Sequence, residues 1–148
     1  MCGLFGELRF DVLSPDLSVI ERMKTQLVKR GPDSEGAWAG GSIALGHRRL
    51  SIIDLSDKAA QPMTDTDSGV ALVFNGTIYN YPELRKELQS LGHQFKSTGD
   101  TEVILRSYIE WGEECIRRLQ GMFAIGIWDS KQQRLSLIHI SEPTRLQV

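Results

Sequence analysis

Cys2 is the residue whose type and position suggest catalysis most directly in this chain. If Met1 is removed after synthesis, Cys2 carries a thiol nucleophile and a free α-amine on one residue. An α-amine has a pKa of about 8, so at neutral pH part of it can accept the thiol proton. Nucleophile and base then share one residue, as in other enzymes that activate a nucleophile with their own N-terminal amine. A cysteine at position 2 is also often incidental, so Cys2 alone does not predict an enzyme.

Three other stretches hold polar groups that could serve such a nucleophile. Arg49 follows a β-rich run, and its guanidinium could bind a carboxylate through two hydrogen bonds. Asn75 and Gly76 end an apolar run, where an amide side chain and a backbone N–H could stabilise an oxyanion. Asp100 comes just before a predicted helix. Each also has an ordinary interpretation: a solvated face for Arg48 and Arg49, a plain Asn-Gly turn, and a helix cap.

The second cysteine and the histidines do not extend this set. Cys115 lies in a helical stretch and is expected to be a small buried apolar residue. His47 is expected to be structural, and the 3 histidines show no paired metal-ligand spacing. We therefore expect no metal site and no disulfide in this chain.

Composition indicates an ordinary globular protein of one domain, with 41% hydrophobic and 24% charged residues. The 17 basic and 19 acidic side chains give a net charge of -2, whereas nucleic-acid binding needs a basic surface. No segment is long and apolar enough to span a membrane, and the first residues lack a signal-peptide pattern. We expect a cytoplasmic protein that binds neither nucleic acid nor membrane.

The elements that must position these residues alternate between strands and helices. Apolar periodicity predicts strands over residues 2–10, 42–55, 69–76, 93–97 and 121–129. It predicts helices over residues 14–32, 81–92 and 98–112, the first of them capped by Ser14 with Pro15 in its first turn. Strands clustered with helices between and after them predict a layered α+β fold.

Six motifs carry a resemblance to a known family. They occur in the order MCGLFG, RGPD, HRRLSIIDL, FNGTIYNY, GDTEV and GMFAIGIWD. The chain thus resembles the class II glutamine amidotransferase domain of the glutamine-hydrolysing asparagine synthetase family. The segment HRRLSIID favours this branch over those that have a TRWATHG-like segment there. The resemblance implies an α+β fold, a four-layer α/β/β/α sandwich of the N-terminal nucleophile hydrolase type, truncated at its C-terminus.

The resemblance also implies roles for individual residues. Cys2 would attack the side-chain amide of glutamine, and Asn75 with Gly76 would form the oxyanion hole. Arg49 would hold the α-carboxylate of glutamine and Asp100 its α-ammonium. The wall of the pocket would use backbone groups near Leu50, Ile52 and Ile53.

Thr77 departs from the family pattern, which has glutamate at this position beside the glutamine α-ammonium. Threonine keeps a hydroxyl acceptor but loses the charge. A charged hydrogen bond is worth roughly 1.5–3 kcal/mol, so glutamine could bind about ten- to a hundredfold more weakly. Two alternatives therefore stay open. The chain could belong to the N-acetylglutaminylglutamine amidotransferase branch, or it could be a non-catalytic domain of the same fold.

The C-terminal residues do not continue the family pattern. The run LSLIHISEPTR is similar to a translated sequencing adapter. We therefore expect residues 1–134 to be an incomplete glutamine amidotransferase domain and residues 135–148 to be a non-native read-through tail. The resemblance implies a longer parent whose synthetase domain uses ATP and Mg²⁺, and a homodimer of this parent is one expectation. These 148 residues themselves are expected to need no cofactor.

Overall fold

The computed structural model describes residues 2–49 and 57–140, which form two antiparallel sheets stacked face to face. Sheet A has the order β1-β3-β2 and consists of β1 (Gly3–Leu8), β2 (Ser34–Gly40) and β3 (Ile43–Arg49). Sheet B has the order β4-β5-β6-β7 and consists of β4 (Met63–Asp65), β5 (Val70–Ile78), β6 (Gly121–Asp129) and β7 (Arg134–Ile140).

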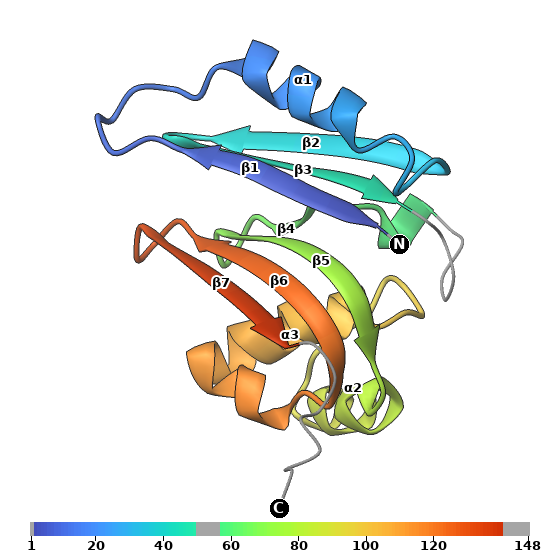
Figure 1. Ribbon diagram of the computed structural model, residues 1–148. Coiled ribbons are helices and arrows are strands. Elements are labelled where there is room, and N and C mark those ends of the chain that lie inside the picture. Colours follow the sequence, from blue (N-terminus) through green and yellow to red (C-terminus); the bar gives the residue numbers. More distant parts are fainter. Residues whose placement is uncertain (1, 50–56, 141–148) are drawn as a thin grey trace, which may run out of the picture.

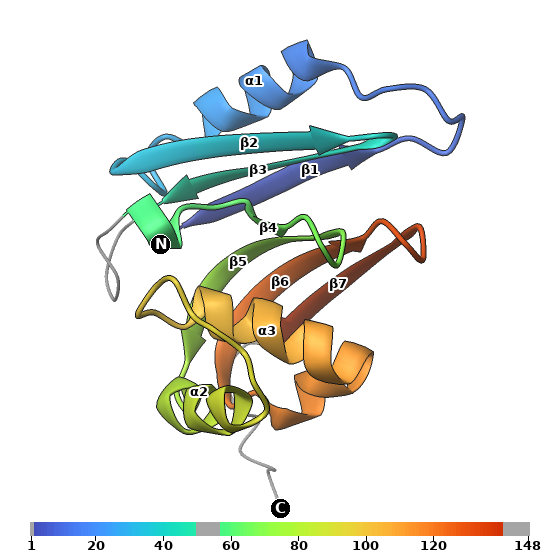
Figure 2. The same ribbon diagram turned by 180° about the vertical axis from the view of Figure 1, so that it is seen from behind.

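Helices cover the outer face of each sheet, so the layers follow the predicted α/β/β/α order (Figures 1 and 2). Sheet A is covered by α1 (Leu17–Gln26). Sheet B is covered by α2 (Tyr81–Ser90) and α3 (Thr101–Trp111), followed by the 3₁₀ segment η2 (Gly112–Arg118). A second 3₁₀ segment, η1 (Asp57–Ala59), precedes β4.

The start of α1 differs from the prediction. Asp16, not Ser14, is the N-cap, and its carboxylate accepts a hydrogen bond from the Ser18 N–H at 2.9 Å. Pro15 therefore lies before the helix rather than in its first turn. Ser14 and Asp16 are both residue types that cap helices, and the sequence did not distinguish them.

The alternation of side chains along the strands decides which residues face the gap between the sheets. Ile43 and Leu45 of β3 pack there against Ala71 and Val73 of β5, together with Trp128 of β6. The intervening β5 side chains, which include Leu72, Phe74 and Ile78, pack instead against α2 and α3. Strand β5 thus has one face toward the gap and one toward the helix layer of sheet B.

Two predicted local structures are wrong. Residues 93–97 form no strand, because the N–H groups of Lys96 and Ser97 donate to the buried Glu102 carboxylate instead of to a neighbouring strand. The Asn75-Gly76 pair does not form a turn, since β5 continues through it to Ile78 and pairs with β6.

Strand β7 lies at the edge of sheet B and pairs with β6 from Asp129↔Arg134 to Phe123↔Ile140. A segment of alternating side chains can add to a sheet edge whatever its origin. The predicted boundary at residue 134 therefore stays a prediction. Within the described residues, no helix has the length and apolar character needed to cross a bilayer.

Candidate active site

Cys2 and Arg49 lie at the same end of sheet A. Cys2 directly precedes Gly3, whose cross-strand partner is Arg48. Leu4 and Leu8 pack against the cluster between the sheets, so strand alternation directs Cys2 to that same face. Arg49 is two residues after His47, whose side chain crosses the gap, and therefore belongs to the same face of β3. The predicted nucleophile and the predicted carboxylate ligand thus project from neighbouring strands into the end of the gap.

Asn75 and Gly76 approach this point from sheet B. Asn75 continues the β5 face that carries Ala71 and Val73, so its side chain also belongs to the gap. The bond from His47 Nε2 to the Phe74 carbonyl oxygen, 2.9 Å long, joins β3 to β5 directly beside Asn75. The two sheets therefore bring the predicted oxyanion-hole residues to the end where Cys2 and Arg49 lie.

The backbone at position 76 requires a glycine. Its φ is 141°, a conformation that favours glycine. A Cβ atom there would lie 2.1 Å from the Met122 carbonyl oxygen, so no side chain fits without moving β6. Gly76 itself is exposed.

Asp100 is buried, and its side chain does not cap α3. One carboxylate oxygen instead accepts a hydrogen bond from the Ile78 N–H at 3.1 Å. Burial raises the pKa of Asp100, opposed by the hydrogen bond from Ile78. A buried carboxylate at the end of β5 is well suited to a cationic ligand group, because a cation would offset the cost of its burial.

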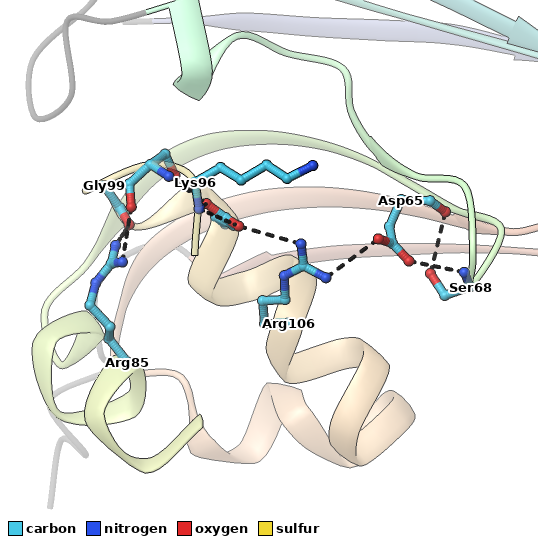
Figure 3. A network of polar contacts seen from close by, with 8 residues as sticks. Asp65, Ser68, Arg85, Lys96, Gly99 and Arg106 are labelled. Carbon is cyan, nitrogen blue, oxygen red and sulfur yellow. Dashed lines mark hydrogen bonds and ion pairs between the residues drawn. The ribbon is translucent and has the colours of Figure 1, made fainter. Parts of the chain in front are cut away.

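Charged side chains fix the loop that leads to Asp100 (Figure 3). The Glu102 carboxylate accepts hydrogen bonds from Lys96 N–H and from both the N–H and the hydroxyl of Ser97, at 2.7–3.1 Å. Arg85 donates to the Ser97 and Gly99 carbonyl oxygens at 2.9 and 2.8 Å. Because both N–H groups and carbonyl oxygens of this loop are bound by side chains, the loop holds Asp100 in one position.

Glu102 is itself supported from the far side. Arg106, one turn further along α3, lies 3.5 Å from Glu102 and 3.4 Å from Asp65 of β4. Asp65 also accepts a hydrogen bond from the Ser68 N–H at 2.9 Å (Figure 3). The network therefore connects the Asp100 loop to β4, which lies at the opposite edge of sheet B from β7.

The prediction that Arg48 and Arg49 form a solvated face is wrong, because both are buried. Arg48 points away from the gap, donates to the Gly31 carbonyl oxygen at 3.0 Å and pairs with Glu35. It thereby holds the turn that follows α1 against sheet A. Two adjacent arginines thus serve the two faces of one strand.

Cys115 is buried in η2, as expected. Burial raises the pKa of its thiol to about 12. Cys115 therefore stays protonated at neutral pH, and Cys2 is the thiol that can act as a nucleophile.

Thr77 is exposed on β5, two residues after Asn75. Leu50, Ile52 and Ile53 lie outside the described residues, so their expected place in the pocket wall stays a prediction. Among the described residues, no group of three or more His, Cys, Asp or Glu side chains could hold a metal ion.

The sequence did not predict the roles of Gln61 and Glu102. Gln61 is buried, and its side chain accepts the Phe74 N–H at 2.6 Å. A glutamine beside a proline in an otherwise small and apolar run was the available signal for Gln61. For Glu102 it was an acidic residue within the apolar helix that follows Asp100.

His47 gives the site a pH-dependent stability. Burial lowers the pKa of His47 from 6.5 to about 4, so its ring is neutral at neutral pH and donates Nε2–H to Phe74. Between these values the unfolded chain binds a proton that folded His47 does not. The free energy of unfolding should therefore fall as the pH drops from 6.5 to about 4, by roughly 3 kcal/mol.

Urea unfolding at pH 7 and pH 5 measures part of this loss, about 2 kcal/mol. The variant His47→Gln lacks the titrating ring and should lose less stability over this interval than the wild type. His93→Gln, which removes a histidine paired with Glu110 at the surface, serves as the matched control. Equal acid sensitivity in all three proteins would contradict the assignment to His47.

Comparison with known proteins leads to the same family as the sequence motifs do. The sequence model of the glutamine amidotransferase domain matches residues 1–139. Asparagine synthetase [glutamine-hydrolyzing] 3 of Bacillus subtilis is 43% identical over 138 residues, covering 91% of this chain and 22% of the relative. A putative asparagine synthetase [glutamine-hydrolyzing] of Mycobacterium tuberculosis is 42% identical over 151 residues, covering 91% of this chain and 23% of the relative.

A solved structure supports the fold. Glutamine phosphoribosylpyrophosphate amidotransferase from Bacillus subtilis, complexed with ADP and GMP, superposes with a TM-score of 0.51. It is 24% identical, and the match covers 62% of this chain and 22% of that one. The chain spans 22% to 23% of the length of the curated relatives described above.

Proposed function

Because this chain belongs to the glutamine amidotransferase domain family, we propose that it hydrolyses the side-chain amide of glutamine to glutamate and ammonia. The observation that carries the proposal is the projection of Cys2, Arg49 and Asn75 into one end of the gap between the sheets. A nucleophile, a carboxylate ligand and an oxyanion donor at one place are what amide hydrolysis requires. Asp100 adds a buried carboxylate for the α-ammonium.

The chemistry begins with the N-terminal amine that Met1 removal would expose. This amine takes the Cys2 thiol proton, and the sulfur attacks the amide carbon of glutamine. The resulting oxyanion accepts hydrogen bonds from the Asn75 side chain and the Gly76 N–H. The carbon–nitrogen bond then breaks, and the protonated N-terminal amine of Cys2 returns the proton to the leaving nitrogen, which departs as ammonia. Water hydrolyses the glutamyl thioester, releasing glutamate and restoring the thiol.

The ammonia would serve a second reaction in a longer protein. We infer that a further domain of the longer protein uses ATP and Mg²⁺ to activate an acid for amide formation. The relatives are named asparagine synthetases, so the first acid to test is aspartate. That domain is the proposed partner of this one, and homodimer formation by the longer protein stays a prediction. The cytoplasmic location of the longer protein likewise stays a prediction.

Thr77 supports a second candidate. An exposed threonine on β5 at the position where the family has glutamate would weaken the hold on the α-ammonium. A domain that binds glutamine without hydrolysing it would tolerate this loss, and so would a member of the N-acetylglutaminylglutamine amidotransferase branch.

Incubation of the chain with L-glutamine tests the proposal. We expect glutamate and ammonia in equal amounts, measured by coupled enzymatic assays, and a mass of the intact chain that shows Met1 removed. Binding of glutamine without glutamate release would instead favour the non-catalytic candidate. D-glutamine is the matched control, because it cannot place both α-substituents and the amide at the same three groups.

A further inference from the structure

We propose that Gln61 is a positioning residue that holds the oxyanion hole of the glutamine site in place. This inference rests on the proposed function and extends it to a residue that supports β5 beside the oxyanion hole. Gln61 is buried, with 9% of its surface exposed. Its side-chain oxygen accepts the Phe74 N–H at 2.6 Å, and its side-chain nitrogen lies 3.5 Å from the Thr101 hydroxyl.

The backbone of β5 needs such a partner at Phe74. Strand β4 pairs with β5 only from Val70 to Leu72, so the β4 side of the next residues has no strand neighbour among the described elements. Phe74 points its N–H and its carbonyl oxygen to that side, where Gln61 binds the first and His47 Nε2 binds the second. Two side chains thus replace the missing strand immediately before Asn75.

The same edge continues into the proposed oxyanion hole. In a strand, the N–H groups of every second residue point to the same side, so Phe74, Gly76 and Ile78 form one row. The first N–H of the row is bound by Gln61 and the third by Asp100, at 3.1 Å. The Gly76 N–H lies between these two fixed points. A change at Gln61 would therefore alter the direction of the N–H that binds the oxyanion.

Gln61 is itself held from sheet A. A Cβ atom on Gly36 of β2 would lie 2.0 Å from the Gln61 carbonyl oxygen, so the Gln61 backbone packs directly on β2. Its side chain meanwhile reaches β5 and the first residue of α3. One residue thus connects sheet A, sheet B and the helix that follows Asp100.

An amide is suited to this position because it offers both an acceptor and a donor. Glutamate would keep the acceptor for Phe74 and lose the donor toward Thr101, whereas leucine would lose both. The series wild type, Gln61→Glu and Gln61→Leu therefore removes the two contacts in steps. Gln89→Leu, on the exposed surface of α2, is the matched control.

The experiment measures two quantities on the 148-residue chain and its variants. The first is hydrogen exchange of the Phe74, Gly76 and Ile78 amides without glutamine. The second is kcat and KM for glutamate release. For Gln61→Leu we expect exchange at Phe74 to rise at least about tenfold and kcat to fall about ten- to a hundredfold, with KM changed less than about threefold. Gln61→Glu should show smaller changes than Gln61→Leu in both the exchange at Phe74 and kcat.

A residue that only stabilised the fold would alter exchange throughout sheet B and leave kcat per folded molecule unchanged. Either that pattern, or values for Gln61→Leu equal to those of Gln89→Leu, would overturn the inference. If Gln61→Leu does not fold, Gln61→Glu provides the same comparison with the control. A wild-type chain that releases no glutamate would overturn the proposed function, and this inference with it. An active wild type with unaffected Gln61 variants would overturn the inference alone.

Discussion

Replacing Cys2 by alanine should abolish glutamine hydrolysis, lowering the rate of glutamate release by at least about a thousandfold. The thiol is the atom that forms the bond to the substrate, and alanine offers no substitute. The free energy of unfolding should change little, because Cys2 lies before β1 and outside the buried core. Glutamate release at saturating glutamine and urea unfolding measure the two effects.

Cys115→Ala provides the matched control for this variant. It removes a thiol that is fully buried and whose pKa is raised to about 12, so the rate per folded molecule should stay near that of the wild type. Its stability should fall, because a buried side chain is shortened. A glutamine analogue with an electrophile at the amide position should label only the N-terminal peptide. Wild-type turnover by Cys2→Ala would show that another group is the nucleophile.

Replacing Asn75 by alanine should lower kcat for glutamine hydrolysis by about a hundred- to a thousandfold, the typical cost of removing one oxyanion-hole donor. KM should change much less, since the donor binds a charge that develops only in the transition state. The half-buried Asn75 side chain belongs to the face toward the gap, so its removal should leave β5 paired with β6. Initial-rate kinetics over a range of glutamine concentrations separate the two constants.

Asn80→Ala is the control for Asn75→Ala. The Asn80 side chain donates to the Arg118 carbonyl oxygen at 2.8 Å and accepts the Gln120 N–H at 3.0 Å. Losing both bonds should destabilise the fold by about 1–2 kcal/mol and leave kcat unchanged. Asn75→Ala should therefore lower the rate and keep the stability, whereas Asn80→Ala should lower the stability and keep the rate. A parallel loss of rate in both would indicate that Asn75 is structural.

Local pattern predicted much of the fold. Alternating residues predicted β1 and β6, a continuous apolar run predicted β5, and apolar spacing predicted α2 and α3 close to their observed bounds. The predictions failed where a distant side chain determines the backbone. The Glu102 carboxylate takes the amides of Lys96 and Ser97 that a strand would have used. Pairing with β6 keeps Asn75-Gly76 extended where the dipeptide alone favours a turn.

The candidate site was also predictable only as far as local pattern reaches. Its members could be named from their types and from the resemblance, and alternation within each strand indicates which of them share a face. The contacts that hold the site come from other layers. His47 binds Phe74 of the other sheet, 27 residues further along the chain, and Gln61 reaches β5 from the segment before β4. No periodicity within one element shows such contacts.

The adjacent arginines of β3 also constrain how the length of this domain can vary in evolution. Arg48 faces α1 and Arg49 faces the gap, because the strand pleat turns successive side chains in opposite directions. One residue inserted or deleted within β3 ahead of His47 would reverse all three side chains together. The histidine would leave the gap, and the arginine that holds the turn after α1 would enter it. The exposed connection between β1 and α1, with Phe10 and Val12 about nine-tenths exposed (92% and 90%), carries no such constraint and can change in length.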